Sequence, residues 1–469
     1  MATHLRSCSL AAALAVAAAW QTGCTVGPDY QKPESAVPAS FKAPEPWRKV
    51  QPSDDADKGE WWKAFDDGKL NELQDKAAKA NPSAKAAFYR AEEARAAVRI
   101  DRAALYPTLF TGLSGDRERG SETASTFASG RTRATVALPL DLEYELDLWG
   151  KLRRQVEATE AEAEAAEADY RNALLSLQSD LALLYFRLRS LDAEQEVLDS
   201  AVAVREKALS LVDARFKAGD VAELDVSQAQ TELSTAKSEA IGLERERRQL
   251  ENAIAVLCGE MPSDFRLKKM PLGGGPPALP GKFPSELLER RPDVAAAERN
   301  LAAASAKVGV AQAAFYPSVT LGSSLSLESR ALNLLFNSSS GAWGLFGDLS
   351  QPVVDGGRRR GSLEKSRAAL NRVGEEYRLA VLTAVRDVED ALSAIDVLKR
   401  QAAAQSDTVE SARRTVEIAQ KRYGSGFVAY FEVVDAQRAL LRAEQEEVRL
   451  RGDRHAAAVA LVKALGGAW

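Results

Sequence analysis

The sequence predicts a mainly α-helical protein with a few β-strands of the membrane type, built from two copies of one unit. Three observations predict it. Several short segments recur along the chain at a nearly constant spacing. Long stretches after the recurring strand-like segments hold no proline and almost no glycine. In each copy, apolar and polar residues also alternate with a period of two. The composition agrees, because aromatic residues make up only 7% of the chain and alanine is abundant, which suits closely packed long helices.

The N-terminus predicts an export signal over residues 1–23. Arg6 precedes an apolar run that is too short for a membrane-spanning helix of ~20 residues. Gly23-Cys24 resembles a bacterial lipoprotein signal in which Cys24 becomes the lipidated first residue, although Gln21 stands where such signals usually have Leu. The alternative is an ordinary signal cleaved nearby, which leaves Cys24 as a free thiol. We expect residues 24–63 to be an extended segment after a stable diacyl anchor.

Four markers recur in the same order, about 207 residues apart, so the chain is interpreted as a duplication. We expect the first copy over residues 64–259 and the second over residues 285–469. Residues 260–284, rich in proline and glycine, are interpreted as a connector rather than a core element. The matching segments are Ala103–Phe110 with Ala313–Thr320, Asp147–Arg154 with Val353–Arg360, Arg215–Gln230 with Arg422–Gln437, and Gly259 with Gly466.

Each copy begins with an Ala-rich helix that is expected to end at Tyr106-Pro107 or Tyr316-Pro317, since proline stops a helix and favours extended chain. Two strand-like segments follow in each copy. Arg131–Trp149 has the clearest alternation, with leucines on one face and acids on the other. The acids, which are candidates to line a polar interior, are Asp141, Glu143, Glu145 and Asp147.

Four strands in a chain cannot close a barrel, and a membrane forbids an open sheet edge. If the strands cross a membrane, a barrel must therefore be shared between chains. The alternative is a four-stranded soluble sheet beside a helical stalk.

Long helices are expected after the strands. Their apolar residues recur at three and four, as in coiled coils. About 65 residues of helix would extend ~100 Å. The predicted ranges are Lys151–Lys217, Val221–Cys258, Ser362–Tyr423 and Phe427–Leu465.

Composition also limits function. The chain has only two histidines and three cysteines, so a metal site, a catalytic triad or a bound cofactor is not expected, and the chain is not interpreted as an enzyme. Its formal net charge is −5 with both signs interspersed, which does not support nucleic-acid binding.

The segments "CTVGPDYQKP", "WWKAFDD", "ELDLWGKLRR" and "ERRPDVAAAERNLAAASAKVGVAQAAFYPSVTL" resemble the TolC-like outer-membrane factors, and most of all the lipoproteins that serve resistance–nodulation–division efflux pumps. The resemblance covers essentially the whole mature chain. It implies a homotrimer with a twelve-stranded outer-membrane β-barrel, four strands per chain, continued by a long α-helical coiled-coil barrel and a small mixed equatorial region. It further implies a lipid-anchored protein in the outer membrane of a Gram-negative bacterium, extending into the periplasm. Its implied partners are a periplasmic adaptor and an inner-membrane pump, and its cargo is small toxic compounds.

The resemblance also implies a gate at the periplasmic tip. Carried over residue by residue, the gate acids fall on Glu432 and Asp435 in "FEVVDA", and the aromatic of the pattern falls on Tyr423. In the first copy Asp225 is the matching acid, while Gln228 replaces the second one. Val428 stands where some relatives carry a basic residue, so no latch is expected from that position.

The residues alone leave other interpretations open. Glu432 and Asp435 share a helix face, where tripled acids would favour cations. The same acids could instead complement a helix dipole, and Asp435 could pair with Arg438. Basic residues follow the glycine at each strand-to-helix junction, where they could meet lipid phosphates or simply be solvated ends of long helices. They are Lys151, Arg153, Arg154, Arg358, Arg359 and Arg360.

A non-conducting structural or adaptor coiled-coil lipoprotein remains the competing function. Cys258 is expected to be a buried small residue at a helix end.

Overall fold

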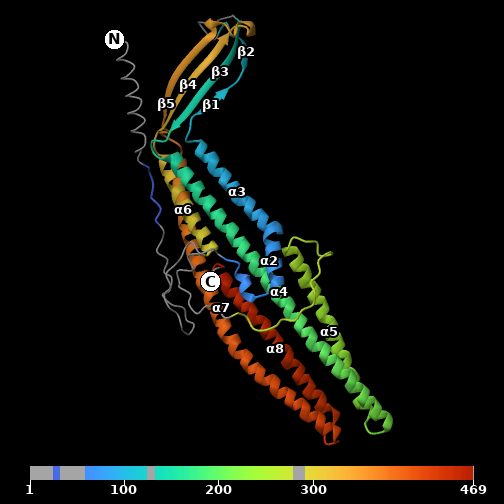
Figure 1. Ribbon diagram of the computed structural model, residues 1–469. Coiled ribbons are helices and arrows are strands. Elements are labelled where there is room, and N and C mark those ends of the chain that lie inside the picture. The colour runs from blue at the N-terminus through green and yellow to red at the C-terminus, as the bar shows by residue number, and fades with distance from the viewer. Residues whose placement is uncertain (1–24, 32–58, 124–131, 278–290, 468–469) are drawn as a thin grey trace. The chain divides into compact units, whose positions relative to one another are not determined.

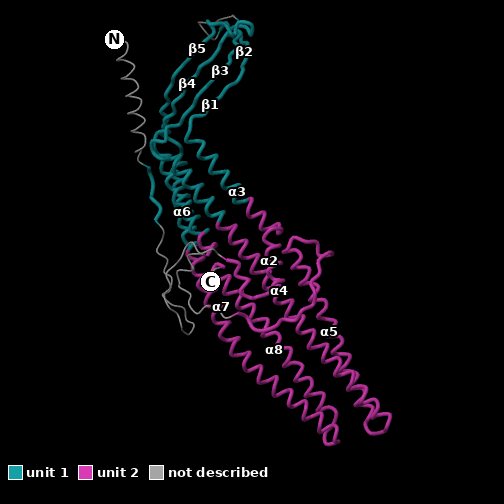
Figure 2. Tube along the Cα trace, in the orientation of Figure 1, with its two compact units in different colours: residues 1–34, 90–167, 296–377 teal, residues 35–89, 168–295, 378–469 magenta. Residues whose placement is uncertain are grey.

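The computed structural model describes residues 25–31, 59–123, 132–277 and 291–467 (Figure 1). The predicted signal peptide and Cys24 lie outside these residues. Contacts within the chain define two compact units whose segments interleave along the sequence (Figure 2). Unit 1 contains Met1–Glu34, Arg90–Glu167 and Ala296–Tyr377, and unit 2 contains Ser35–Tyr89, Ala168–Ala295 and Arg378–Trp469.

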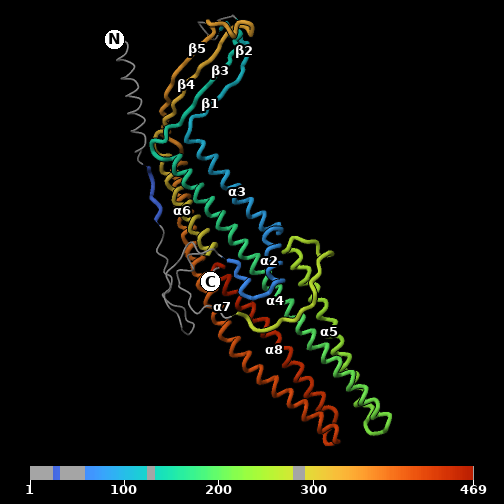
Figure 3. The backbone as a smooth tube through the Cα atoms, viewed as in Figure 1, coloured from blue at the N-terminus to red at the C-terminus, as the bar shows by residue number. Residues whose placement is uncertain are grey.

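The two Ala-rich helices end where the Tyr-Pro pairs predict. Helix α3 spans Pro82–Ala103 and helix α6 spans Pro292–Ala313. Each continues into a turn in which the tyrosine backbone N–H donates to the last helical carbonyl, at 3.1 Å for Tyr106 and 3.0 Å for Tyr316. A strand begins directly after each proline. The duplicated order of helix, strands and long helices is therefore present in both copies (Figure 3).

Unit 1 contains one antiparallel sheet. Strands β1 and β2 both pair with β3, so they act as one interrupted strand, and the sheet is four strands wide as predicted. The order continues from β3 through β4 to β5. The strands are β1 Thr108–Thr111, β2 Ser114–Arg119, β3 Thr132–Leu146, β4 Ser318–Ser329 and β5 Gly341–Ser350.

The register keeps the predicted alternation across the sheet. Leu140 lies opposite Leu325, which lies opposite Trp343 on the next strand. The other face is polar, and the Ser324 hydroxyl donates to the Asp141 carboxylate at 2.6 Å. Glu143 and Glu145 share that face with Asp141 because they are two and four residues further along the strand. The face also holds Gly322, where an added Cβ would lie 2.0 Å from the ring of Phe346.

Strand β3 ends at Leu146, earlier than the predicted end at Trp149. The reason is Asp147, whose carboxylate accepts from the backbone N–H groups of Leu152 at 3.0 Å and Arg153 at 2.9 Å. Asp147 therefore caps the following helix rather than joining the acids on the sheet. Trp149 leaves the strand and stacks on Tyr316, with ring centroids 4.9 Å apart.

Four long helices follow the predicted ranges within a few residues. Gly374 and Gly452 do not interrupt them. Close packing favours glycine at position 452, because a Cβ there would lie 3.0 Å from the Cβ of Ser190. The helices are α4 Lys151–Ala218, α5 Glu223–Leu257, α7 Arg358–Gly424 and α8 Tyr430–Ala464.

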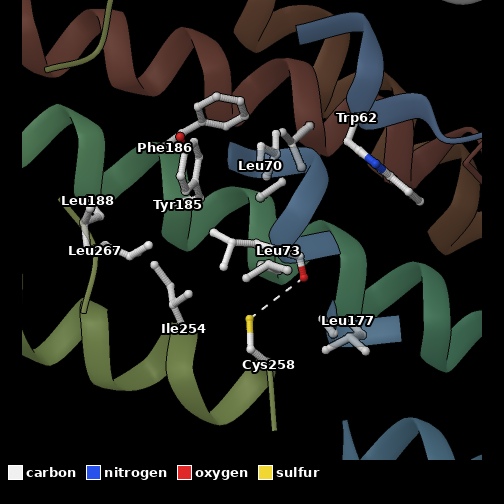
Figure 4. Close-up of a cluster of buried hydrophobic side chains, with 14 of the residues drawn as sticks. Trp62, Leu70, Leu73, Leu177, Tyr185, Phe186, Leu188, Ile254, Cys258 and Leu267 are labelled. Carbon is white, nitrogen blue, oxygen red and sulfur yellow. Dashed lines mark hydrogen bonds between the residues drawn. The ribbon is translucent and has the colours of Figure 1, made fainter. Parts of the chain in front are cut away.

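Unit 2 has its largest core where helix α2 (Gly68–Ala80) and the 3₁₀ helix η2 (Trp61–Phe65) pack on α4 and α5 (Figure 4). Asp67 caps α2 and also accepts from the Tyr185 hydroxyl at 2.7 Å. Cys258 is fully buried at the end of α5, which confirms the expected role.

The connector was wrongly separated from the core. Phe265, Leu267 and Leu272 are all buried in the core of unit 2. Their backbone is fixed by side chains of the long helices, since Glu251 accepts from the N–H of Leu267 and Arg189 donates to the Lys268 carbonyl at 2.7 Å. Apolar residues between prolines and glycines thus enter a core when nearby charged groups satisfy the irregular backbone.

The hairpins α4–α5 and α7–α8 carry equivalent ion pairs with exchanged charges. Glu206 on α4 meets Lys237 on α5 at 2.7 Å. At the matching positions of the second copy, Arg413 on α7 meets Glu444 on α8 at 2.8 Å. The duplication therefore preserves an ion pair at this level but not the residues that form it.

Candidate functional site

Both long hairpins turn through a similar glycine loop, and this loop contains the recurring segments. Gly219 and Gly426 have positive φ angles of 84° and 75°, which a side chain rarely adopts. After them, Asp220 donates its N–H to the Arg215 carbonyl at 3.0 Å, and Phe427 donates to the Arg422 carbonyl at 2.9 Å. These bonds close the helices in the manner of a Schellman motif.

A small hydrophobic cluster ties the two hairpin ends together inside unit 2. It draws residues from all four long helices, so the two recurring segments share one core. The buried members are Val212, Ala229, Val416, Ala419, Tyr430, Val433, Val434 and Ala436. The hairpin turns are thus fixed against each other by apolar packing.

The predicted gate acids lie on the side of α8 away from this cluster. Glu432 is in the first turn of α8, and Asp435 follows on the same face. Both are exposed, whereas Val433 and Val434 between them are each only 4% exposed. Asp225 is in the first turn of α5 and is half-buried. Within one chain, the two α8 acids are therefore free to present charge to solvent or to another chain.

Tyr423 faces inward instead. Its ring lies 5.4 Å from that of Tyr430, and the guanidinium of Arg215 lies 5.2 Å from its ring centroid. Its hydroxyl is buried without a hydrogen-bond partner among the described residues. Burial raises the pKa of Tyr430, and the neighbouring Tyr423, Glu232 and Asp225 raise it further. Tyr423 therefore links α7 to the C-terminal end of α4, and its ring is not exposed beside the gate acids.

A buried ion network that the sequence did not predict lies close to this cluster. Glu232 on α5 is 6% exposed and accepts from Arg438 Nε on α8 at 2.9 Å. Its other carboxylate oxygen lies 3.2 Å from Arg205 Nη2 on α4, and Arg205 Nη1 donates to the backbone carbonyl of Glu232 at 2.9 Å. One carboxylate thus joins three helices from two hairpins.

This network replaces the suggested pairing of Asp435 with Arg438. The hydrogen bond that Arg438 donates to Glu232 is the main cause that raises the pKa of Arg438, and the field of Asp435 adds to it. A sequence signal for Glu232 did exist, because Ala439 occupies the matching position in the second copy. Glu232 has one partner within its own hairpin, Arg205, and a second in the other hairpin, Arg438.

A shallow groove of 300 Å³ lies between α5 and α8 beside the network. Leu224 and Phe431 line it and are 65% and 57% exposed, while Glu232 and Arg438 form its polar wall. An apolar groove with one ion network can hold another helix by its apolar face.

Two further properties concern the described part of the chain as a whole. No group of three or more histidine, cysteine or acidic side chains that could hold a metal ion occurs among these residues. Likewise, none of the helices within the described ranges has the length and hydropathy needed to cross a membrane.

Comparison with known proteins identifies the family. The model of the family described as "Outer membrane efflux protein" matches residues 73–260 and 283–467. The chain is 33% identical over 479 residues to the probable efflux pump outer membrane protein SepC of Pseudomonas putida, which covers 100% of this chain and 98% of that protein. It is also 33% identical over 464 residues to the outer membrane protein OprJ of Pseudomonas aeruginosa, covering 95% and 93% of the two chains.

Solved structures give the same result. The outer-membrane channel OprN superposes with a TM-score of 0.88 at 30% identity, covering 95% of this chain and all of that one. CusC superposes with a TM-score of 0.84 at 27% identity, covering 94% and 100%. The chain is therefore an outer-membrane component of efflux in a Gram-negative bacterium, and it belongs to the outer membrane efflux protein family.

Proposed function

We propose that three copies of this chain form an outer-membrane duct that passively conducts small toxic compounds to the cell exterior. The sheet is the observation that carries this proposal. Its apolar face is exposed, with Trp343 at 79% and Leu345 at 76%. Its two edges, β5 and β1 with β2, have no strand partner among the described residues. Edges of this kind are tolerated in a membrane only when another chain closes them.

Twelve strands from three chains would close the barrel, with the long hairpins continuing it as a coiled-coil barrel into the periplasm. We retain the proposed signal peptide, the extended segment after lipidated Cys24 and the two repeats. Residues 260–284 remain the proposed equatorial region, with Phe265, Leu267 and Leu272 packed in the core of unit 2. A periplasmic adaptor and a resistance–nodulation–division pump would deliver the compounds. The names of relatives support this class of cargo, since one 33% identical protein is a toluene efflux pump outer membrane protein, TtgF of Pseudomonas putida.

The proposed gate consists of rings of Glu432 and Asp435 at the hairpin ends, with Asp225 in the first turn of α5 as a further acid. The inward-facing Tyr423 would support the gate by packing on Tyr430. The exposure of both α8 acids supports this role, because a threefold axis would bring like charges together. Such rings repel one another and attract cations. The buried valines next to them support a fixed direction for the acids.

Planar-bilayer recording of the purified oligomer tests both parts. We expect a cation-preferring conductance, and we expect Glu432→Ala with Asp435→Ala to raise it and weaken the cation preference. The matched control is Glu410→Ala with Glu417→Ala, which removes two exposed acids from α7 away from the turn. An unchanged conductance in the gate variant would assign these acids to the helix dipole. The absence of any conductance would favour the non-conducting structural or adaptor lipoprotein.

A further inference from the structure

We propose that the segment after β5 is a docking surface for anionic phospholipid headgroups, in the leaflet on the helical side of the sheet. We call it the β5–α7 anchor and define it as Val353, Val354, Arg358 and Arg360. The inference rests on the proposed crossing of the membrane by the sheet, but not on conduction or gating.

The structure separates the six basic residues at the strand-to-helix junctions into two groups. In the first copy all three are engaged. Lys151 donates to Glu145 at 3.0 Å, Arg153 Nε lies 3.1 Å from Asp147, and Arg154 contacts Asp29 at 2.6 Å. The basic side chains of the first junction therefore stabilise the fold through ion pairs.

The second junction uses only its middle arginine in this way. Arg359 is paired with Asp355 at 2.6 Å and lies over the ring of Phe315 at 5.6 Å. Asp355 also accepts from the N–H of Gly357 at 3.0 Å, so the start of α7 is already capped. Arg358 is exposed and has no side-chain partner among the described residues, and Arg360 has only a 3.9 Å approach to the exposed Glu364. Two guanidinium groups thus remain available.

The chain just before these arginines is apolar and unusually exposed. Val353 is 88% exposed and Val354 is 89% exposed. They follow the end of β5, whose exposed apolar face includes Leu349 at 69% exposure. A pair of highly exposed valines next to two exposed arginines, with no acidic partner closer than 3.9 Å in the described part of the chain, is unfavourable in water but suits the boundary between hydrocarbon and headgroups.

The length of β5 places the anchor at that boundary. Its ten residues extend ~33 Å along the strand, which a barrel tilt of about 40° reduces to ~25 Å of height. This matches the apolar band of an outer-membrane barrel. The valines then lie at the edge of the hydrocarbon, and the arginines reach the phosphate layer beyond it.

The neighbouring aromatic residues agree with this position. Tyr316 is 43% exposed, and the Trp149 ring stacked on it donates to the Pro317 carbonyl at 2.8 Å. Tryptophan and tyrosine are enriched at both membrane interfaces. Each arginine near an anionic lipid surface strengthens binding about fivefold, so the two together give about 30-fold.

Lipid binding by the purified full-length oligomer tests the charge. Retained phosphatidylglycerol would be titrated by native mass spectrometry, with phosphatidylcholine as the neutral comparison. Arg358→Gln with Arg360→Gln is expected to weaken the apparent affinity for phosphatidylglycerol about 30-fold, without changing that for phosphatidylcholine. The control, Arg400→Gln with Arg414→Gln, also removes two exposed arginines from α7 and should change it less than about twofold. A double variant that keeps its preference for phosphatidylglycerol overturns the proposal, even if the conductance is normal.

Spin labelling tests the placement independently of charge. Labels at Val353→Cys and Val354→Cys in bilayers of phosphatidylcholine with phosphatidylglycerol should be more accessible to oxygen than to a nickel chelate. A label at the exposed Ser406→Cys on α7 should show the reverse. Greater access of the chelate to the valine sites, or protection from both reagents by a neighbouring copy, would each overturn the anchor.

Discussion

Neutralising Glu232 should loosen the end of the α4–α5 hairpin most, although its buried carboxylate also contacts Arg438 on α8. The perturbation is Glu232→Gln, which keeps the shape of the side chain and removes its charge. Two cations then face each other across an amide. The side chains of Glu232 and Arg205 are each 7% exposed, whereas that of Arg438 is 47% exposed.

The magnitudes follow from those exposures. Breaking a buried ion pair on one side costs ~3–5 kcal/mol, and an exposed pair contributes ~0–1 kcal/mol. Glu232→Gln retains one hydrogen-bond acceptor, so we expect the lower end, about 3 kcal/mol. Arg438→Gln should cost less than about 1 kcal/mol, because its guanidinium is half in solvent. The energy of the network therefore lies mainly between α4 and α5.

Native-state hydrogen exchange is the assay, because it reports opening of α5 and α8 separately from global unfolding. A loss of about 3 kcal/mol corresponds to about 150-fold faster exchange in the protected amides around residue 232. Glu232→Leu combined with Arg205→Met should recover most of the protection, since a buried pair can be replaced by apolar residues of similar volume. Unchanged exchange in Glu232→Gln, or an equal effect from Arg438→Gln, would refute this reasoning.

Two further predictions use buried titratable groups. Burial lowers the pKa of His455 below 6.5, so between its folded pKa and about 6.5 the unfolded chain binds the proton more strongly, and stability falls as the pH falls. The free energy of unfolding, measured with denaturant at about pH 5.5 and about pH 7.5, should therefore change less between the two pH values in His455→Gln than in the unaltered protein. An identical change in both proteins would contradict this prediction. Burial raises the pKa of Cys258 to about 11, so a maleimide should label this thiol only after denaturation. Labelling of the folded protein at the same rate would show that the thiol is accessible.

The sequence allowed accurate prediction wherever the controlling interactions are local. Proline fixes the ends of α3 and α6 whatever surrounds them, and the alternation around Leu140 determines which face of β3 is apolar. The glycine loops at Gly219 and Gly426 are local as well, so both hairpin turns lie within the recurring segments.

Prediction failed where a residue depends on a partner far along the chain. Asp147 continued the alternating pattern of its strand, but its carboxylate caps a helix instead. For Arg438 the sequence suggested a pair with Asp435, three residues away, but its guanidinium pairs with Glu232 on another helix. Phe265 and Leu272 looked like parts of a linker because nothing in their own segment shows that Arg189 and Glu251 satisfy the backbone around them. The gate acids remain a prediction, since a ring involves other copies of the chain.

The ion pairs of the two hairpins, in which the acid and the base have changed places, indicate which kind of contact tolerates a change of residues. Exchanging the charges of the Glu206–Lys237 pair one residue at a time, without a neutral residue in between, passes through a pair of like charges. At partly exposed positions such an intermediate loses at most ~1 kcal/mol, so drift can cross it. The same exchange at Glu232 would leave unpaired charges in a buried site, and the loss of stability would be several times larger. Solvent exposure therefore makes the charges of the Glu206–Lys237 pair easier to exchange than the buried charge of Glu232.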